Sequence, residues 1–261
     1  MNTTPAVANM PVEGVLVEAL GISKRFGGHQ AVDNVSVSAR SGEVTSVIGP
    51  NGAGKTTLIN CLTGIIPFDT GELRINGQLY RRLAPQDLIE IGISRTFQNI
   101  RLWENLSVLE HVLLARRSYL RTARAARRNS STDAGARDTA HELLQRVELD
   151  HKARMMPAQL SYGERRRLEI VRALAISPVL LFLDEPAAGF MLAEQVKLAA
   201  LIREIAAKQV AIILVEHHMD LIARVSSSVV VLNFGKELTT GSIDQIRQNP
   251  DVIAAYLGTA A

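Results

Sequence analysis

A glycine-rich segment of the chain has the residues needed to bind phosphate. It comprises Gly49, Pro50, Asn51, Gly52, Ala53, Gly54, Lys55 and Thr56, and it matches G-x-x-x-x-G-K-[ST] at every fixed position. A β-rich run, 44–48, precedes the segment, and a helical pattern begins at Thr57. Glycines let backbone N–H groups face an anion, and the start of a helix adds positive potential. We therefore expect a nucleotide site in which Lys55 contacts the β- and γ-phosphates and Thr56 binds Mg²⁺.

Two adjacent acids, Asp184 and Glu185, follow the apolar run 180–183. Open α/β sheets build their sites at the carboxyl ends of such strands. We expect Asp184 to hold Mg²⁺, directly or through water, and Glu185 to accept a proton from an attacking water. A solvated acidic turn before Pro186 is the alternative, which the glycine-rich segment disfavours. The chain has no N-K-x-D string of the kind that reads guanine, so a GTPase is disfavoured.

The string Leu160-Ser161-Tyr162-Gly163-Glu164 indicates a helix start that could also bind an anion. The S-x-x-E spacing of Ser161 and Glu164 is typical of a capping box, and an amphipathic helical pattern follows. A hydroxyl and a glycine at a helix N-terminus can also bind phosphate. One chain would then have two helix starts able to bind phosphate.

The same string resembles the signature motif of ABC ATPases, usually L-S-G-G-Q, and it precedes the paired acids as in that family. The resemblance implies that Ser161, Gly163 and Glu164 of one subunit complete the ATP site of another. The working unit would be a head-to-tail dimer with ATP and Mg²⁺ at its interface. This arrangement would account for two anion sites in one chain.

The remaining motifs of the family occur in the expected order. Phe26 resembles the aromatic residue that stacks on adenine, although a core phenylalanine is an alternative. Gln98 resembles the glutamine that contacts Mg²⁺ or the attacking water, and His217 resembles the histidine that contacts the γ-phosphate. Two departures stand out. The chain has Phe190-Met191-Leu192 where relatives usually have Leu-Asn-Pro, and His218 where aspartate is usual.

The strings Arg95 to Leu102, L-S-Y-G-E, Glu216-His217 and Asn249 to Gly258 resemble the ATP-binding subunits of branched-chain amino-acid importers. The resemblance implies a peripheral subunit on the cytoplasmic face of a bacterial or archaeal membrane. Its partners would be a second ATPase, identical or paralogous, two permeases and, indirectly, an extracytoplasmic solute-binding protein. Nucleic acid is not among them. Importers of urea, amides or other amino acids, a soluble non-transport ABC ATPase and an assembly module with weak hydrolysis are the alternatives.

Alternating strand-like and helix-like runs must position these residues. They predict an α/β fold, a P-loop NTPase core of the ABC ATPase type, with a mostly parallel sheet and an N-terminal antiparallel β part. β-rich runs occur at 15–20, 32–39, 44–48, 73–75, 179–183, 211–215 and 229–232, and helical patterns at 55–63, 105–128, 137–147, 164–176, 193–207 and 242–248. We expect one ATP-binding domain, 12–258, with a helical subdomain inserted at about 99–175. Residues 1–11 are expected to form a flexible tail.

Composition sets the remaining bounds. The chain has 261 residues, of which 47% are hydrophobic and 21% charged, with a net charge of +3. The single cysteine, Cys61, excludes an intrachain disulfide and fits a reducing compartment. No apolar run approaches the roughly 20 residues of a spanning helix, so a partner would make the membrane connection. The segment 116–128 carries six arginines and no acid, and we expect it to be a solvated face of the helical insert or a contact for anionic lipid, nucleic acid or a permease loop.

Overall fold

The structure is a computed structural model that describes residues 14–122 and 133–257. The predicted tail, 1–11, and residues 123–128 of the arginine-rich segment lie outside the described residues. No helix among the described residues is long and apolar enough to span a bilayer.

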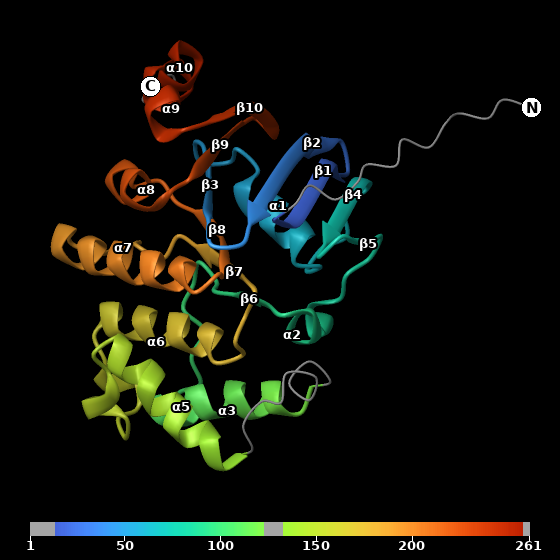
Figure 1. Ribbon diagram of the computed structural model, residues 1–261. Helices are drawn as coiled ribbons and strands as arrows, with labels where there is room; N and C mark the ends of the chain where they lie inside the picture. Colours follow the sequence, from blue (N-terminus) through green and yellow to red (C-terminus); the bar gives the residue numbers. More distant parts are fainter. Residues whose placement is uncertain (1–13, 123–132, 258–261) are drawn as a thin grey trace, which may run out of the picture.

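A sheet of six strands forms the centre of the molecule, in the order β10-β9-β3-β8-β7-β6 (Figure 1). The strands are β3 Val44–Ile48, β6 Ile93–Arg95, β7 Leu180–Asp184, β8 Ala211–Val215, β9 Ser228–Asn233 and β10 Lys236–Gly241. Only the β10–β9 pair is antiparallel. Strands β3, β7 and β8 are buried at every residue, and all but Thr45, Ser46 and Asp184 among these residues are apolar. The predicted, mostly parallel sheet is confirmed.

A second sheet of four strands lies beside it, in the order β2-β1-β4-β5. Its strands are β1 Val15–Phe26, β2 His29–Arg40, β4 Thr70–Ile75 and β5 Gln78–Tyr80, and all its pairs are antiparallel. Helix α1, Lys55–Leu62, shares one hydrophobic core with both sheets. The N-terminal antiparallel part is therefore confirmed, and the core holds the start of α1 in place.

The other helices are α2 Leu88–Ile91, α3 Val108–Leu120, α5 Asp133–Arg146, α6 Tyr162–Leu174, α7 Leu192–Ala207, α8 Met219–Val225, α9 Ile243–Gln248 and α10 Pro250–Leu257. The sequence patterns missed β5, β6, β10, α2, α8 and α10. These elements hold three to eight residues, too few to show a clear period. Helix α3 ends at Leu120, so residues 121 and 122 of the predicted helix 105–128 are not helical, and residues 123–128 of it lie outside the described residues.

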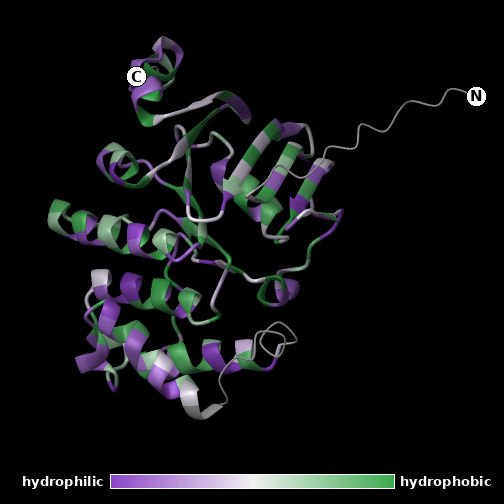
Figure 2. Cartoon of the chain, in the orientation of Figure 1, coloured by the Kyte–Doolittle hydropathy of each residue, from purple (hydrophilic) through white to green (hydrophobic). Residues whose placement is uncertain are grey.

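Helices α3, α5 and α6 form a helical layer with a core of its own (Figure 1). Helix α6 contributes to two cores: Leu168 and Val171 face α3 and α5, whereas Ile170 and Ala173 face the sheet and α7. Figure 2 shows hydrophobic and hydrophilic residues following one another along these helices. The inserted helical subdomain is confirmed as part of the fold, and α6 joins it to the sheet. Its residue limits, 99–175, stay a prediction.

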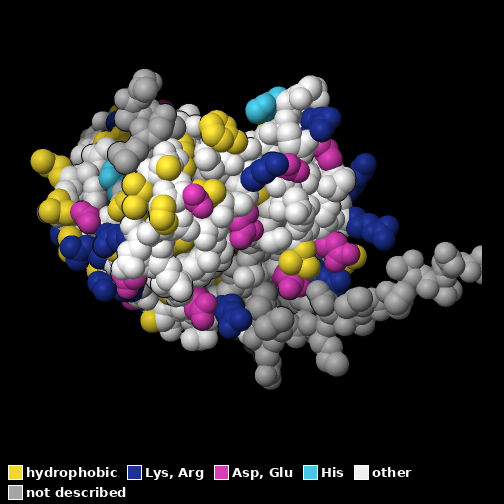
Figure 3. Space-filling model, turned by 90° about the horizontal axis from the view of Figure 1, so that it is seen from above, with side chains coloured by type: hydrophobic (Ala, Val, Ile, Leu, Met, Phe, Trp, Pro, Cys, Tyr) yellow, Lys and Arg dark blue, Asp and Glu magenta, His cyan; other side chains and the backbone are white. Residues whose placement is uncertain are grey.

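Charged side chains are mixed on the face seen in Figure 3. Lysine and arginine side chains occur there together with aspartate and glutamate side chains, and hydrophobic side chains gather toward its left half. The small net charge of +3 agrees with this mixture, because basic and acidic residues occur in nearly equal numbers.

Candidate nucleotide site

The glycine-rich loop connects buried β3 to α1 by a tight path. A Cβ at Gly49 would lie 2.2 Å from the backbone oxygen of Leu232, and one at Gly54 would lie 2.5 Å from that of Ala31. Both glycines also have positive φ values, 150° and 100°. Because a larger residue would strike the backbone, only glycine fits either position.

Lys55, the first residue of α1, is held by the loop that precedes it. Its Nζ donates hydrogen bonds to the backbone oxygens of Gly49 at 2.6 Å and Pro50 at 2.9 Å. Burial lowers the pKa of Lys55, and the carboxylates of Glu185 and Asp184 oppose that shift. Lys55 as a whole is only 7% exposed, so its ammonium is a partly desolvated charge beside the loop.

A cleft of about 380 Å³ opens in front of the loop. The loop and α1 supply one wall with Asn51, Gly52, Ala53, Gly54, Lys55, Thr56 and Thr57, and the rest comes from Phe26, His29, Ala31, Gln98 and Glu185. The cleft thus brings together residues predicted separately from the sequence. Phe26 is 49% exposed, so it is a wall residue and not a core residue. His29 and Ala31, at the start of β2, were missed by the sequence analysis.

Asp184 ends β7 and is 2% exposed. Its Oδ2 accepts a hydrogen bond from Nη2 of Arg95 at 2.9 Å, and its Oδ1 is buried without a hydrogen-bond partner. Burial raises the pKa of Asp184, and the hydrogen bond from Arg95 opposes this shift. An orphaned, buried carboxylate oxygen costs free energy unless something binds it, so this atom fits a cation such as Mg²⁺.

Glu185 follows at the mouth of the cleft with an unusual backbone. Its φ is +46°, which for a residue other than glycine costs on the order of 1–3 kcal/mol and is commonest at functional sites. Its N–H donates to Val215 O at 2.9 Å, and its Oε2 accepts from Nε2 of Gln98 at 3.1 Å. The structure therefore places the predicted base and the predicted glutamine in direct contact.

The signature string forms the capping box that its spacing predicted. The Ser161 N–H donates to Glu164 Oε2 at 2.9 Å, and the Glu164 N–H donates to Ser161 Oγ at 3.3 Å. The other oxygen of Glu164 accepts from Lys152 Nζ at 2.6 Å. Ser161, Gly163 and Glu164 are not among the described residues that line the cleft. Within one chain, the two predicted anion sites are thus separate features of the surface.

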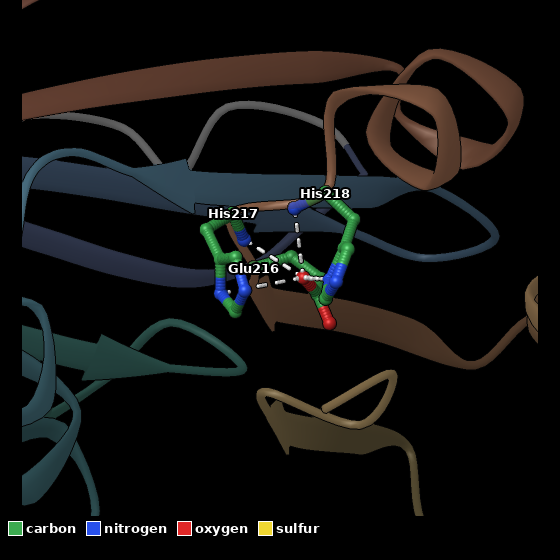
Figure 4. A group of neighbouring side chains, drawn as sticks. All are labelled: Glu216, His217 and His218. Carbon is green, nitrogen blue, oxygen red and sulfur yellow. Dashed lines mark hydrogen bonds and ion pairs between the residues drawn. The ribbon is translucent and has the colours of Figure 1, made fainter. Parts of the chain in front are cut away.

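His217 follows β8, whose last residue pairs with Asp184 in the sheet. Its side chain is 49% exposed and is not among the described residues lining the cleft. Glu216, which is fully buried, accepts from the backbone N–H groups of His217 and His218 (Figure 4). Both Glu216 and Arg95 stand in strings that carry the family resemblance, but the sequence analysis assigned neither a role. Each binds a residue that only the tertiary structure brings near it, and such a contact leaves no periodic pattern in the sequence.

The residues Phe190, Met191 and Leu192, which differ from the usual Leu-Asn-Pro of the family, lie partly in the core and partly on the surface. Phe190 is 9% exposed and packs with α6, α7 and the sheet, whereas Met191 and Leu192 are 77% and 62% exposed. Replacement of the usual polar residue thus leaves two apolar side chains in water. Ring atoms of Tyr162 lie 3.2 Å from where a Cβ of Gly189 would be, so this loop lies against the start of α6.

Comparison with known proteins gives consistent matches over most of the chain. The family model described as ABC transporter matches residues 32–188, and that of the branched-chain amino acid ATP-binding cassette transporter matches 237–261. The chain is 40% identical over 253 residues to the high-affinity branched-chain amino acid transport ATP-binding protein BraF of Pseudomonas aeruginosa. It is also 40% identical over 254 residues to LivG of Escherichia coli strain K12, a protein of the same description. Both alignments cover 94% of this chain and 98% of the relative.

Solved structures show the same fold. The ADP conformation of MJ1267, an ATP-binding cassette of an ABC transporter, matches with a TM-score of 0.83 and 28% identity. That match covers 94% of this chain and 99% of the other. A dimeric post-hydrolysis state of the cassette MJ0796, bound to ADP and Pi, matches with a TM-score of 0.76 and 25% identity over 87% of this chain and 98% of the other.

Proposed function

The chain belongs to the ABC transporter family of ATP-binding subunits, and from that membership we propose that it hydrolyses ATP to energise an importer of branched-chain amino acids. One observation carries the catalytic part: a single cleft brings the phosphate loop, Phe26, Gln98 and Glu185 together. The cargo is supported by similarity to BraF and LivG over 94% of the chain and by the match at 237–261.

ATP would bind with its phosphates on the loop and its adenine on Phe26. Backbone N–H groups of residues 51–57 and the start of α1 would surround the β-phosphate. Lys55 would exchange its hydrogen bonds to Gly49 and Pro50 for bonds to the β- and γ-phosphates. An exposed aromatic ring that lines the same cleft suits stacking, because an adenine can cover it without repacking a core.

Mg²⁺ would be held by the Thr56 hydroxyl, Asp184 and Gln98, and it would neutralise charge on the phosphates. The orphaned Oδ1 of Asp184 supports this assignment. Glu185 would accept a proton from the attacking water, which Gln98 would help to orient through its 3.1 Å contact with the carboxylate. His217 would approach the γ-phosphate from the end of β8.

A second ATPase subunit would complete each site. Ser161, Gly163 and Glu164 lie at the start of α6 and do not line the cleft of their own chain, and Ser161 is exposed, so this helix start could face a neighbouring subunit. The dimeric state of the cassette MJ0796 supports pairing of two such subunits. The partner would be an identical copy or a paralogue.

Two permeases would connect the dimer to the cytoplasmic face of the membrane, where the subunit would bind peripherally. The segment around Gln98 joins the sheet to the helical layer, so closure around ATP would move any permease loop bound there. An extracytoplasmic binding protein would deliver cargo from the other side.

Uptake measurements in the source organism test the proposed function. Deletion of the gene should abolish high-affinity uptake of labelled leucine, isoleucine and valine, and the wild-type chain should restore it. A Glu185→Gln chain should be present at the same level without restoring uptake. Retained leucine uptake together with lost urea or amide uptake would assign another cargo and contradict the branched-chain proposal.

Phe26→Ala should weaken ATP binding by about 1–3 kcal/mol, the range of base–aromatic stacking. The loss should appear in titrations with ATP and be much smaller with inorganic triphosphate, which has no base. Phe234→Ala is the matched control, because Phe234 is 84% exposed and is not among the described residues lining the cleft. Equal ATP affinity of Phe26→Ala and wild type would remove Phe26 from the nucleotide site.

A further inference from the structure

Glu216 is a fully buried carboxylate that accepts four hydrogen bonds from two segments of the chain. Its Oε1 accepts the N–H of Ala187 at 3.0 Å, in the loop 185–191 that follows β7. Its Oε2 accepts the N–H groups of His217 at 2.7 Å and His218 at 3.0 Å. The same oxygen lies 2.7 Å from Nδ1 of His218, and Figure 4 shows these contacts converging on it.

The arrangement needs a carboxylate and not merely a polar side chain. Only an ionised carboxylate offers two oxygens that are both acceptors, and each oxygen here serves a different segment. Four donors also compensate the cost of burying a charge that is 0% exposed. A glutamine at this position would direct its amide N–H₂ group at backbone N–H groups, either that of Ala187 or those of His217 and His218.

The two segments carry the groups assigned to hydrolysis. Glu185 and Ala187 belong to the loop after β7, and His217 belongs to the segment after β8. Their backbones are already joined once, because Glu185 N–H donates to Val215 O at 2.9 Å. Glu216, the next residue after Val215, adds the side-chain link.

We infer that Glu216 is a positioning residue that links the loop 185–191 to the histidine segment and thereby sets His217 relative to Glu185. The inference rests on the proposed function, because it uses the roles assigned there to Glu185 and His217.

Glu216, His217 and His218 offer possible metal-ligand atoms within 4.8 Å of one another. A metal site is therefore the competing explanation for this cluster. The hydrogen bonds favour the link. Oε2 already receives two backbone N–H groups and lies beside His218 Nδ1, and a cation there would face those two N–H dipoles. A metal-binding carboxylate oxygen normally turns its lone pairs toward the ion.

Glu216→Gln tests the inference by separating turnover from binding. We expect kcat to fall by about tenfold or more, because a buried charge-assisted contact is lost on one segment. ATP affinity should stay within about twofold, since no wall of the cleft changes. Glu237→Gln, in the exposed part of β10, is the matched control and should retain wild-type kcat. Wild-type kcat in Glu216→Gln, with folding verified by thermal unfolding, overturns the inference.

A double-mutant comparison distinguishes positioning from general stability. If Glu216 acts through His217, Glu216→Gln combined with His217→Ala should be no slower than His217→Ala alone. Multiplied losses in the double variant would assign Glu216 a role independent of His217 and overturn the inference.

Hydrogen exchange supplies a readout that needs no turnover. Glu216→Gln should speed amide exchange in peptides covering Ala187 or His217 and His218, whereas Glu237→Gln should not. Unchanged protection in both peptides overturns the link. A wild-type chain that shows this protection but fails to hydrolyse Mg-ATP with its permeases would instead refute the proposed function and leave the link standing.

Discussion

Glu185→Gln should retain ATP binding and lose at least about 10²-fold in hydrolysis, because the amide cannot accept the proton of the attacking water. The substitution is nearly isosteric. The new amide oxygen can still accept from Gln98 Nε2, which lies 3.1 Å from Glu185 Oε2, so the loop geometry should persist. The loss would then report the missing base and not a collapsed site.

The same variant should accumulate an ATP-bound dimer, because the proposed shared sites would hold ATP between the two subunits for as long as it is not hydrolysed. Size-exclusion chromatography with light scattering in ATP and Mg²⁺ measures it, and steady-state phosphate release measures turnover. Glu237→Gln again provides the exposed control. Hydrolysis by Glu185→Gln within about threefold of wild type would assign the base to another group.

Complementation between two inactive chains is expected to have an equally large effect. Lys55→Ala removes the charge that faces the β- and γ-phosphates, and Gly163→Asp places a carboxylate at the start of α6, where the neighbour's γ-phosphate would lie. Each variant alone should be inactive. If sites form between chains, a mixed dimer contains one site with both defects and one intact site, so mixing should restore part of the activity.

The surroundings of Gly163 call for a control on the Gly163→Asp variant. A Cβ at Gly163 would lie 2.7 Å from Oε1 of Glu194 in the same chain, so Gly163→Asp also brings two carboxylates together there. Gly163→Ala is therefore the matched control, because its methyl group meets the same oxygen without a charge. Gly163→Ala should keep most of its activity, and an equal loss in both variants would assign the effect to local crowding. For a chain that pairs only with a paralogue, the two substitutions are divided between the partners.

A crosslink gives independent information on the same point. Cysteines at Ser161 and Asn51 should join only across chains, more efficiently in ATP. Asn51 suits this purpose because it is exposed on the cleft wall and, unlike Gly52, does not need a positive φ. The native Cys61 is buried, and burial raises the pKa of its thiol to about 11, so it should not compete. An efficient crosslink within a single monomer contradicts the shared site.

Local motifs and burial patterns were readable from the sequence. The phosphate loop, the paired acids and the Ser161–Glu164 capping box each lie within a few consecutive residues, so their geometry follows from short-range backbone rules. The central strands were equally clear, because a parallel strand covered on both faces is rich in apolar residues, as β7 and β8 are. Order and spacing of these motifs also carried the family, which the comparisons confirmed.

Tertiary structure decided which of these residues meet. Gln98 and Glu185 are 87 residues apart, and Arg95 and Asp184 are 89 apart. Their contacts depend on the register in which β6, β7 and β8 pair as neighbours, since Arg95 lies opposite Phe182 and Asp184 opposite Val215. The exposure of Phe26 and the buried position of Glu216 depend in the same way on distant segments packing around them. The sequence contains the side chains that form these contacts. Strand order and burial bring them together, and neither can be derived from the short-range periodicity of the sequence.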